Sequence, residues 1–203
     1  MKKVIILTVF TCITFLVNAQ DFDSLKKAFY QSYSLDSSKQ YEQAAAVLKT
    51  VYSDSDYEIN LRLGWLYYEA GKNTDAIAYY QKAIAIQPNS IEAKLGIVYP
   101  LSVIPNWDEV LNQYLNILKI DSRQPLVNYR VSLMYYNSKN YTEAKKYLDT
   151  YLQIYPFDYD ALVLSGWNSI AMNNKADAKI YFQKALLNHP NDTSAKQGLD
   201  LTN

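Results

Sequence analysis

The sequence predicts an all-α fold built from repeated helix–turn–helix units, and two observations carry this prediction. First, the 34 residues at 57–90 realign with 91–124, 125–158 and 159–192 without any gap. Second, apolar residues within each window recur at spacings of three and four, which place them on one face of a helix. A period of this length is typical of solenoids, in which each unit buries its apolar face against its neighbours.

The columns that agree best describe two helices that approach each other closely. Three of the four windows carry a small residue at their eighth position, namely Gly64, Ser132 and Gly166, whereas the window at 91–124 carries Val98. A small residue there lets the backbone of one helix come near the side chains of the next. The second helix is expected to bury its twenty-fourth position, which is Tyr80, Tyr114, Leu148 and Phe182 in the four windows.

The ends of the expected helices are marked as well. The turns inside the units lie at 71–73, 138–140 and 173–174, where Gly and Asn tolerate the left-handed conformation that closes a helix. Proline stops the second helix in three windows. Two residues after each proline stands a Ser or Asp, whose side-chain oxygen can cap the N-terminus of the next helix. The prolines are Pro88, Pro156 and Pro190, and the capping residues are Ser90, Asp158 and Asp192.

This pattern resembles the tetratricopeptide repeat (TPR) family. The residues that carry the resemblance are Leu63, Gly64, Tyr67, Ala76, Tyr80, Ala83 and Pro88. It implies a right-handed α–α superhelix over 20–192, and a partial capping helix at 193–203. The implied units are at about 25–56, 57–90, 91–124, 125–158 and 159–192.

The match is loosest at 91–124, where Pro100 falls inside the expected first helix. Its ring would press on the carbonyl of Gly96 and remove one hydrogen bond. Two readings stay open: a kink that opens a pocket beside Tyr99, or a degenerate repeat that still packs.

Residues 1–19 have the pattern of a secretory signal peptide. Two lysines precede an apolar run from Val4 to Val17, and Ala19 ends a short segment that fits a signal-peptidase site. The run is shorter than the roughly 20 apolar residues that a spanning helix needs. We therefore expect cleavage after Ala19, a periplasmic or secreted mature chain, and no stable membrane span afterwards. The alternative is an uncleaved anchor.

The composition excludes several classes of function. Basic and acidic residues both number 20, so the chain lacks the positive charge of a nucleic-acid-binding protein. One Cys and one His exclude a disulfide scaffold or a zinc finger within the chain. No Gly-rich phosphate loop, nucleophile elbow or paired metal ligands occur. We therefore expect no enzyme, no cofactor and no nucleic-acid partner.

The resemblance also implies a binding surface, because the first helices of this family line a concave groove. The stripe that would face this groove is aromatic here, and it also contains Glu58, Leu61, Glu92 and Leu95. The candidate groove residues are Phe29, Tyr30, Tyr33, Arg62, Trp65, Tyr68, Tyr99, Tyr129, Arg130, Leu133, Tyr136 and Trp167.

Three readings of this stripe remain. The first is an interaction scaffold that binds an extended peptide segment or partner protein, since Tyr, Trp and Arg are the residues that dominate such interfaces. The second is a binder of glycan or cell-wall fragments that stack on the rings. In the third, the rings only pack against neighbouring helices. At the other end of the chain, Leu199 and Leu201 predict an apolar edge suited to weak self-association.

Overall fold

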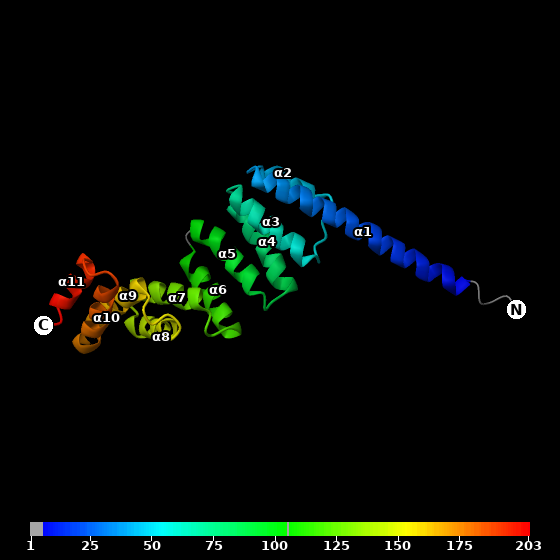
Figure 1. Ribbon diagram of the computed structural model, residues 1–203. Helices are drawn as coiled ribbons and strands as arrows, with labels where there is room; N and C mark the ends of the chain where they lie inside the picture. The colour runs from blue at the N-terminus through cyan, green and yellow to red at the C-terminus, as the bar shows by residue number, and fades with distance from the viewer. Residues whose placement is uncertain (1–5, 105) are drawn as a thin grey trace. The chain divides into compact units, whose positions relative to one another are not determined.

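The computed structural model describes residues 6–104 and 106–203, with side chains from residue 22 onward (Figure 1). Within these ranges the chain forms helices and turns and no strand. It divides into two compact units, which meet in the sequence at Asn106 and Trp107. The division falls inside the segment 91–124 that was expected to form the third repeat, so the two helices of that segment belong to different units.

The first unit is a row of helices in which each contacts its neighbours in sequence. α1 packs against α2, α3 against α4, and α4 against α5, while α3 also contacts α5. This is the contact pattern of a solenoid, in which every second helix lies between two first helices. The helices are α1 (Ile6–Ser37), α2 (Tyr41–Lys49), α3 (Tyr57–Glu69), α4 (Asn73–Ile86) and α5 (Ile91–Val103).

The second unit repeats this pattern. α7 packs against α8 and α9 against α10, and the last helix, α11, covers α10 and α9. The helices are α6 (Trp107–Ile120), α7 (Pro125–Asn137), α8 (Tyr141–Leu152), α9 (Tyr159–Ala171), α10 (Lys175–Asn188) and α11 (Thr193–Asp200). α11 lies in the segment expected to be a partial capping helix, and it buries Ala195.

The predicted N-caps are confirmed. The side chains of Ser90, Asp158 and Asp192 each accept a hydrogen bond from the backbone N–H three residues further on, at 3.0, 2.9 and 2.6 Å. Asp56 caps α3 in the same way. Each bond satisfies one of the N–H groups that a helix leaves unpaired in its first turn.

The turns inside the units adopt the expected left-handed conformation, with one correction. Gly71 and Asn173 have φ values of +74° and +58°, but in the third turn the residue is Lys139, with a φ of +62°, and not an asparagine. Asn140 instead caps α8, since its Oδ1 accepts a bond from the N–H of Glu143 at 3.4 Å. In all three turns the left-handed residue directly precedes the N-cap of the next helix, so the position in the repeat fixes this conformation and the residue type does not.

The core of the first unit holds an aromatic ring between two glycines. The ring of Tyr80, on α4, lies over Gly64 of α3 and Gly96 of α5, and Tyr80 is only 2% exposed. A Cβ atom on Gly64 would stand 2.8 Å from the ring, and one on Gly96 would be closer still. Glycine is therefore what allows both helices to contact the same ring.

The second unit contains the same arrangement. Phe182, on α10, is fully buried between Gly166 of α9 and Gly198 of α11. The two rings are separated in sequence by three repeats, and each is flanked by glycines 16 residues before and after it. The same contact thus recurs at a multiple of the 34-residue period.

The segment between these two cores lacks the glycines. Tyr114 occupies the ring column, but Val98 and Arg130 stand in the two columns where the repeats of Tyr80 and Phe182 have glycine. Tyr114 was expected to be buried, and the structure leaves it half-buried. Without glycine on either side, the neighbouring helices cannot approach this ring as they do at Tyr80 and Phe182. The division between the two units falls in the same segment.

Paired tyrosines add to the packing within each unit. Tyr67 and Tyr79 stack with their ring centres 5.3 Å apart, and Tyr135 and Tyr147 stack at 5.7 Å. The second pair stands two repeats after the first in the same columns, so much of the tyrosine content of this chain is a property of the scaffold.

Pro100 does not end its helix. α5 continues three residues past it, and the carbonyl of Pro100 accepts the N–H of Ile104 at the end of the helix. The carbonyl that loses its partner belongs to Gly96, a residue whose backbone adjusts at low cost.

The first five residues of the predicted signal peptide lie outside the described residues, and residues 6–19 belong to α1, which runs past Ala19. In the part of the chain that the structure describes, no helix combines the length and the apolar character needed to cross a membrane.

Gly166→Ala is expected to lower the free energy of unfolding by about 1–3 kcal/mol, the usual cost of overpacking. The added Cβ would stand 2.5 Å from Cε1 of Phe182, which outweighs the gain of up to about 1 kcal/mol in helix propensity. Urea unfolding followed by circular dichroism measures the change. Adding Phe182→Leu should recover part of it, since Leu148 fills this column where no glycine flanks it. A Gly166→Ala protein as stable as the wild type would contradict the packing described.

Candidate functional site

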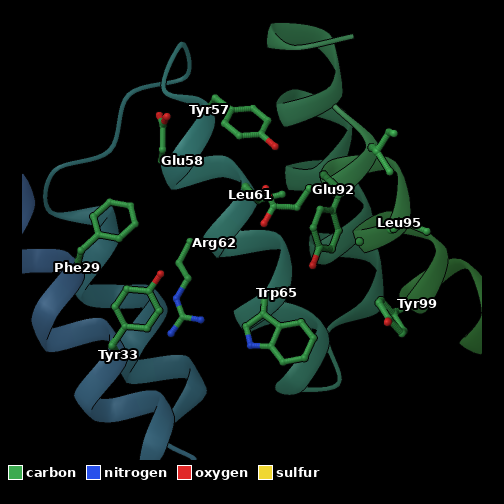
Figure 2. A pocket seen from close by; sticks show the side chains of 13 residues that line it. Phe29, Tyr33, Tyr57, Glu58, Leu61, Arg62, Trp65, Glu92, Leu95 and Tyr99 are labelled. Carbon is green, nitrogen blue, oxygen red and sulfur yellow. The ribbon is translucent and has the colours of Figure 1, made fainter. Parts of the chain in front are cut away.

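A cavity of about 830 Å³ opens on the first unit, between α1, α3 and α5. Figure 2 shows Phe29 and Tyr33 of α1 on one side, Arg62 and Trp65 of α3 in the middle, and α5 on the other side. We call this cavity the aromatic pocket. Its lining residues are Phe29, Tyr33, Tyr57, Glu58, Leu61, Arg62, Trp65, Tyr80, Ile91, Glu92, Leu95, Gly96 and Tyr99.

Helical spacing brings these side chains together. Residues separated by three or four positions share one face of a helix, and α3 and α5 present the same columns of two successive repeats. α3 contributes Glu58, Leu61, Arg62 and Trp65, and α5 contributes Glu92, Leu95 and Tyr99. Because α3 and α5 both contact the ring of Tyr80, the two faces lie next to each other.

Arg62 joins two walls of the pocket. Its Nη2 atom lies 2.7 Å from Oδ2 of Asp36, on α1, and the guanidinium carbon lies 4.1 Å from the ring centre of Tyr33. The side chain is only 11% exposed, and its Nε is buried without a hydrogen-bond partner. A charge-assisted bond and a cation–π contact therefore fix α3 against α1. The sequence analysis predicted Arg62 as a ligand-binding residue. In the structure its guanidinium is instead paired with Asp36 of the same chain.

The aromatic walls remain open to solvent. Tyr33, Trp65 and Tyr99 are 56%, 36% and 52% exposed. Tyr68 lies between two of them, with ring centres 6.0 Å from Trp65 and 5.6 Å from Tyr99. The rings of Trp65, Tyr68 and Tyr99 thus form a continuous apolar surface that a flat or extended ligand can cover.

One end of the pocket is acidic. Glu58 and Glu92 belong to the first turns of α3 and α5, and both are exposed. Between them the hydroxyl of Tyr57 lies 2.7 Å from Oγ of Ser90. Burial raises the pKa of Tyr57, and both nearby carboxylates add to the effect. Burial also raises the pKa of Tyr80, so both phenols stay neutral at physiological pH.

Two predicted groove residues of the first unit do not line the pocket. Tyr30 is absent from the lining and is 77% exposed, while Tyr68 contacts two rings of the lining. The prediction in turn omitted Tyr57, Ile91 and Gly96. Tyr57 and Ile91 open their windows one helical turn before two residues of the predicted stripe, so extending the stripe by one turn would have found them.

Three of the predicted residues of the second unit pack against side chains of that unit. Tyr129, Leu133 and Tyr136 pack against the buried cluster around Leu148, and Arg130 is exposed. These contacts match the reading in which the rings serve packing.

Trp167 is also part of the packing of its unit. Its ring meets Phe182 edge-on at 5.3 Å, and its Nε1 donates to Oγ of Ser194 at 2.9 Å. The indole thus fixes α11 against α9.

The fold and the pocket together define a helical repeat protein with an open aromatic pocket. Three models of the tetratricopeptide repeat match the chain, at residues 31–91, 127–158 and 160–192, and together they cover more than half of it. The chain belongs to the tetratricopeptide repeat family.

Two curated proteins are similar in sequence. Type IV pilus assembly protein PilF of Pseudomonas aeruginosa is 29% identical over 153 residues, which make up 73% of this chain and 60% of the relative. Protein O-mannosyl-transferase TMTC1 of Homo sapiens is 32% identical over 102 residues, 50% of this chain. The chain spans only 12% of the length of the human protein.

Solved structures share the fold at low sequence identity. A tetratricopeptide repeat protein from Parabacteroides merdae has a TM-score of 0.73 at 18% identity, with 89% of this chain and 72% of that chain covered. MamA has 0.71 at 18% identity, with 83% and 93% covered. YrrB, described as having an unusual peptide-binding site, has 0.71 at 14% identity, with 92% and 97% covered. This likeness confirms the predicted class, an all-α superhelical repeat fold.

Asp36→Asn is expected to lower the free energy of unfolding by about 1–3 kcal/mol, because it leaves a mostly buried guanidinium without its counter-ion. The matched control is Asp149→Asn, which breaks the more exposed pair of Lys145 and Asp149 and should cost no more than about 0.5 kcal/mol. Chemical denaturation of both variants measures the difference. Equal losses would show that Arg62 does not depend on Asp36.

Proposed function

We propose that this chain is a non-catalytic interaction scaffold that binds an extended peptide segment of a partner protein in the aromatic pocket. The observation that carries the proposal is the exposure of Tyr33, Trp65 and Tyr99, each at least 36% exposed on the walls of one cavity. Large exposed apolar surfaces are uncommon on monomeric proteins, and those that occur often mark binding sites.

The pocket has the size and chemistry for a weak and selective contact. Its volume of about 830 Å³ is in the range of ligand sites. Covering three rings gains very roughly 5–9 kcal/mol, from which the cost of association and of ordering a flexible peptide is subtracted. We therefore expect dissociation constants in the micromolar range or weaker.

The lining supports binding in preference to catalysis. It includes no Ser, Thr, Cys or Lys to act as a nucleophile and no His to act as a general base beside one. Glycan binding remains the alternative use of the same rings, since sugars also stack on Tyr and Trp.

We also propose that the chain is exported and that residues 1–19 are removed, so that the mature protein works in the periplasm or outside the cell. The support is the sequence pattern described above. Mass spectrometry of the protein recovered from a bacterial periplasmic extract is expected to give a chain that begins at Gln20. An intact chain that stays in the cytoplasm would rule out this proposal.

We also propose that copies of the chain associate weakly through their C-terminal edge. Leu199 packs on the core of its own unit, whereas Leu201 is 51% exposed. If copies associate there, Leu201→Ser should lower the dimer fraction in analytical ultracentrifugation.

Trp65→Ala is expected to weaken binding of a partner by roughly tenfold or more, the cost of removing a central aromatic anchor. Crosslinking capture from an envelope extract, followed by scanning the recovered partner with overlapping peptides, measures the loss. Tyr30→Ala is the control, because Tyr30 is exposed on α1 outside the pocket.

If all three proteins recover the same partners equally well, the aromatic pocket is not the binding site. Retention on purified peptidoglycan that Trp65→Ala abolishes would favour the glycan alternative instead.

A further inference from the structure

Two carboxylates at the rim of the aromatic pocket have no basic partner. Figure 2 shows Glu58 and Glu92 at the same end of the pocket, on either side of Tyr57. Among the residues that the structure describes, neither carboxylate takes part in an ion pair. Their charges are therefore available to a ligand.

The positive charge of the pocket is neutralised by a carboxylate other than these two. Arg62 is the one basic residue of the lining, and its guanidinium is paired with Asp36 at 2.7 Å. The pocket thus has two uncompensated negative charges next to low-dielectric aromatic walls. Such walls focus the field and raise the local concentration of cations.

The aromatic walls suit a cation as well. Tyr33, Trp65 and Tyr99 present exposed rings, and the negative face of a ring attracts a positive group placed over it. The protein already uses this interaction, since the guanidinium of Arg62 lies 4.1 Å from the ring centre of Tyr33.

Resting on the proposed function, we infer that the aromatic pocket recognises a basic side chain, Lys or Arg, within the bound peptide. Such a side chain has an apolar stem and a charged head. The stem lies along Trp65 and Leu95, and the head reaches the carboxylates of Glu58 and Glu92. An acidic peptide would be repelled by the same two groups.

The two glutamates have a second role that the test must separate from recognition. Acidic residues in a first turn stabilise the positive end of a helix. Asp75 and Asp108 hold the equivalent places on α4 and α6, they are exposed, and they do not line the pocket. Asp75→Asn/Asp108→Asn therefore removes two first-turn charges without touching the site, and is the matched control for Glu58→Gln/Glu92→Gln.

The experiment uses three blocked pentapeptides of alanine and leucine that differ only in a central Lys, norleucine or Glu. The indole N–H signal of Trp65, assigned with Trp65→Phe, reports binding in NMR titrations of the full mature chain. We expect the lysine peptide to bind about fivefold more tightly than the norleucine peptide, and the glutamate peptide to bind most weakly. The preference for lysine should decline as salt rises to about 0.5 M.

Glu58→Gln/Glu92→Gln is expected to remove the preference for lysine while keeping the binding of norleucine, and the control variant should keep the preference within about twofold. Helix content measured by circular dichroism verifies that both variants are folded. Equal binding of all three peptides to the wild type overturns the inference and leaves the proposed function standing. Failure of every peptide to shift the Trp65 signal overturns both.

Discussion

The arrangement of helices in each unit depends on one contact, an aromatic ring held between glycines on two neighbouring helices. In the first unit the ring is Tyr80, and the glycines are Gly64 and Gly96. Since glycine has no Cβ, α3 and α5 both approach this ring, and their outward faces become the floor and one wall of the aromatic pocket. The exposed site thus depends on the core contact beneath it, and a change in the buried ring would move both helices that present ligand-facing residues.

Much of the fold could be predicted because the signals are local. A cap such as Asp158, or a proline after a helix, acts within a few residues, and the repeat multiplies each signal. The residue types alone did not show which position of each turn takes the left-handed conformation, or where the chain divides into two units. Lys139 takes the left-handed conformation because it holds the same place in its turn as Gly71 and Asn173 do in theirs. The division of the chain falls in the segment of Tyr114, where Val98 and Arg130 stand in place of the two glycines that flank Tyr80 and Phe182.

The candidate site was predictable to a smaller extent. Periodicity places a residue on a face of a helix, but its exposure depends on side chains far away in sequence. Tyr129 lies on the predicted stripe, yet its ring centre is 5.3 Å from that of Tyr151, on the next helix. Arg62 and Arg130 share a column, but Asp36, 26 residues before Arg62, gives only the first of them an acidic partner. Such pairings need three-dimensional coordinates.

The pocket also spans most of the first unit, from Phe29 to Tyr99. Helical arrays hold together through contacts between neighbours, and their ends are the first parts to open. An occupant of the aromatic pocket touches α1, α3 and α5 at once, so it joins the terminal helix to one that lies two repeats further along. Binding would therefore hold α1 against α3 and α5. The whole first unit, and not only the helix nearest to the partner, would then open less often when the pocket is occupied.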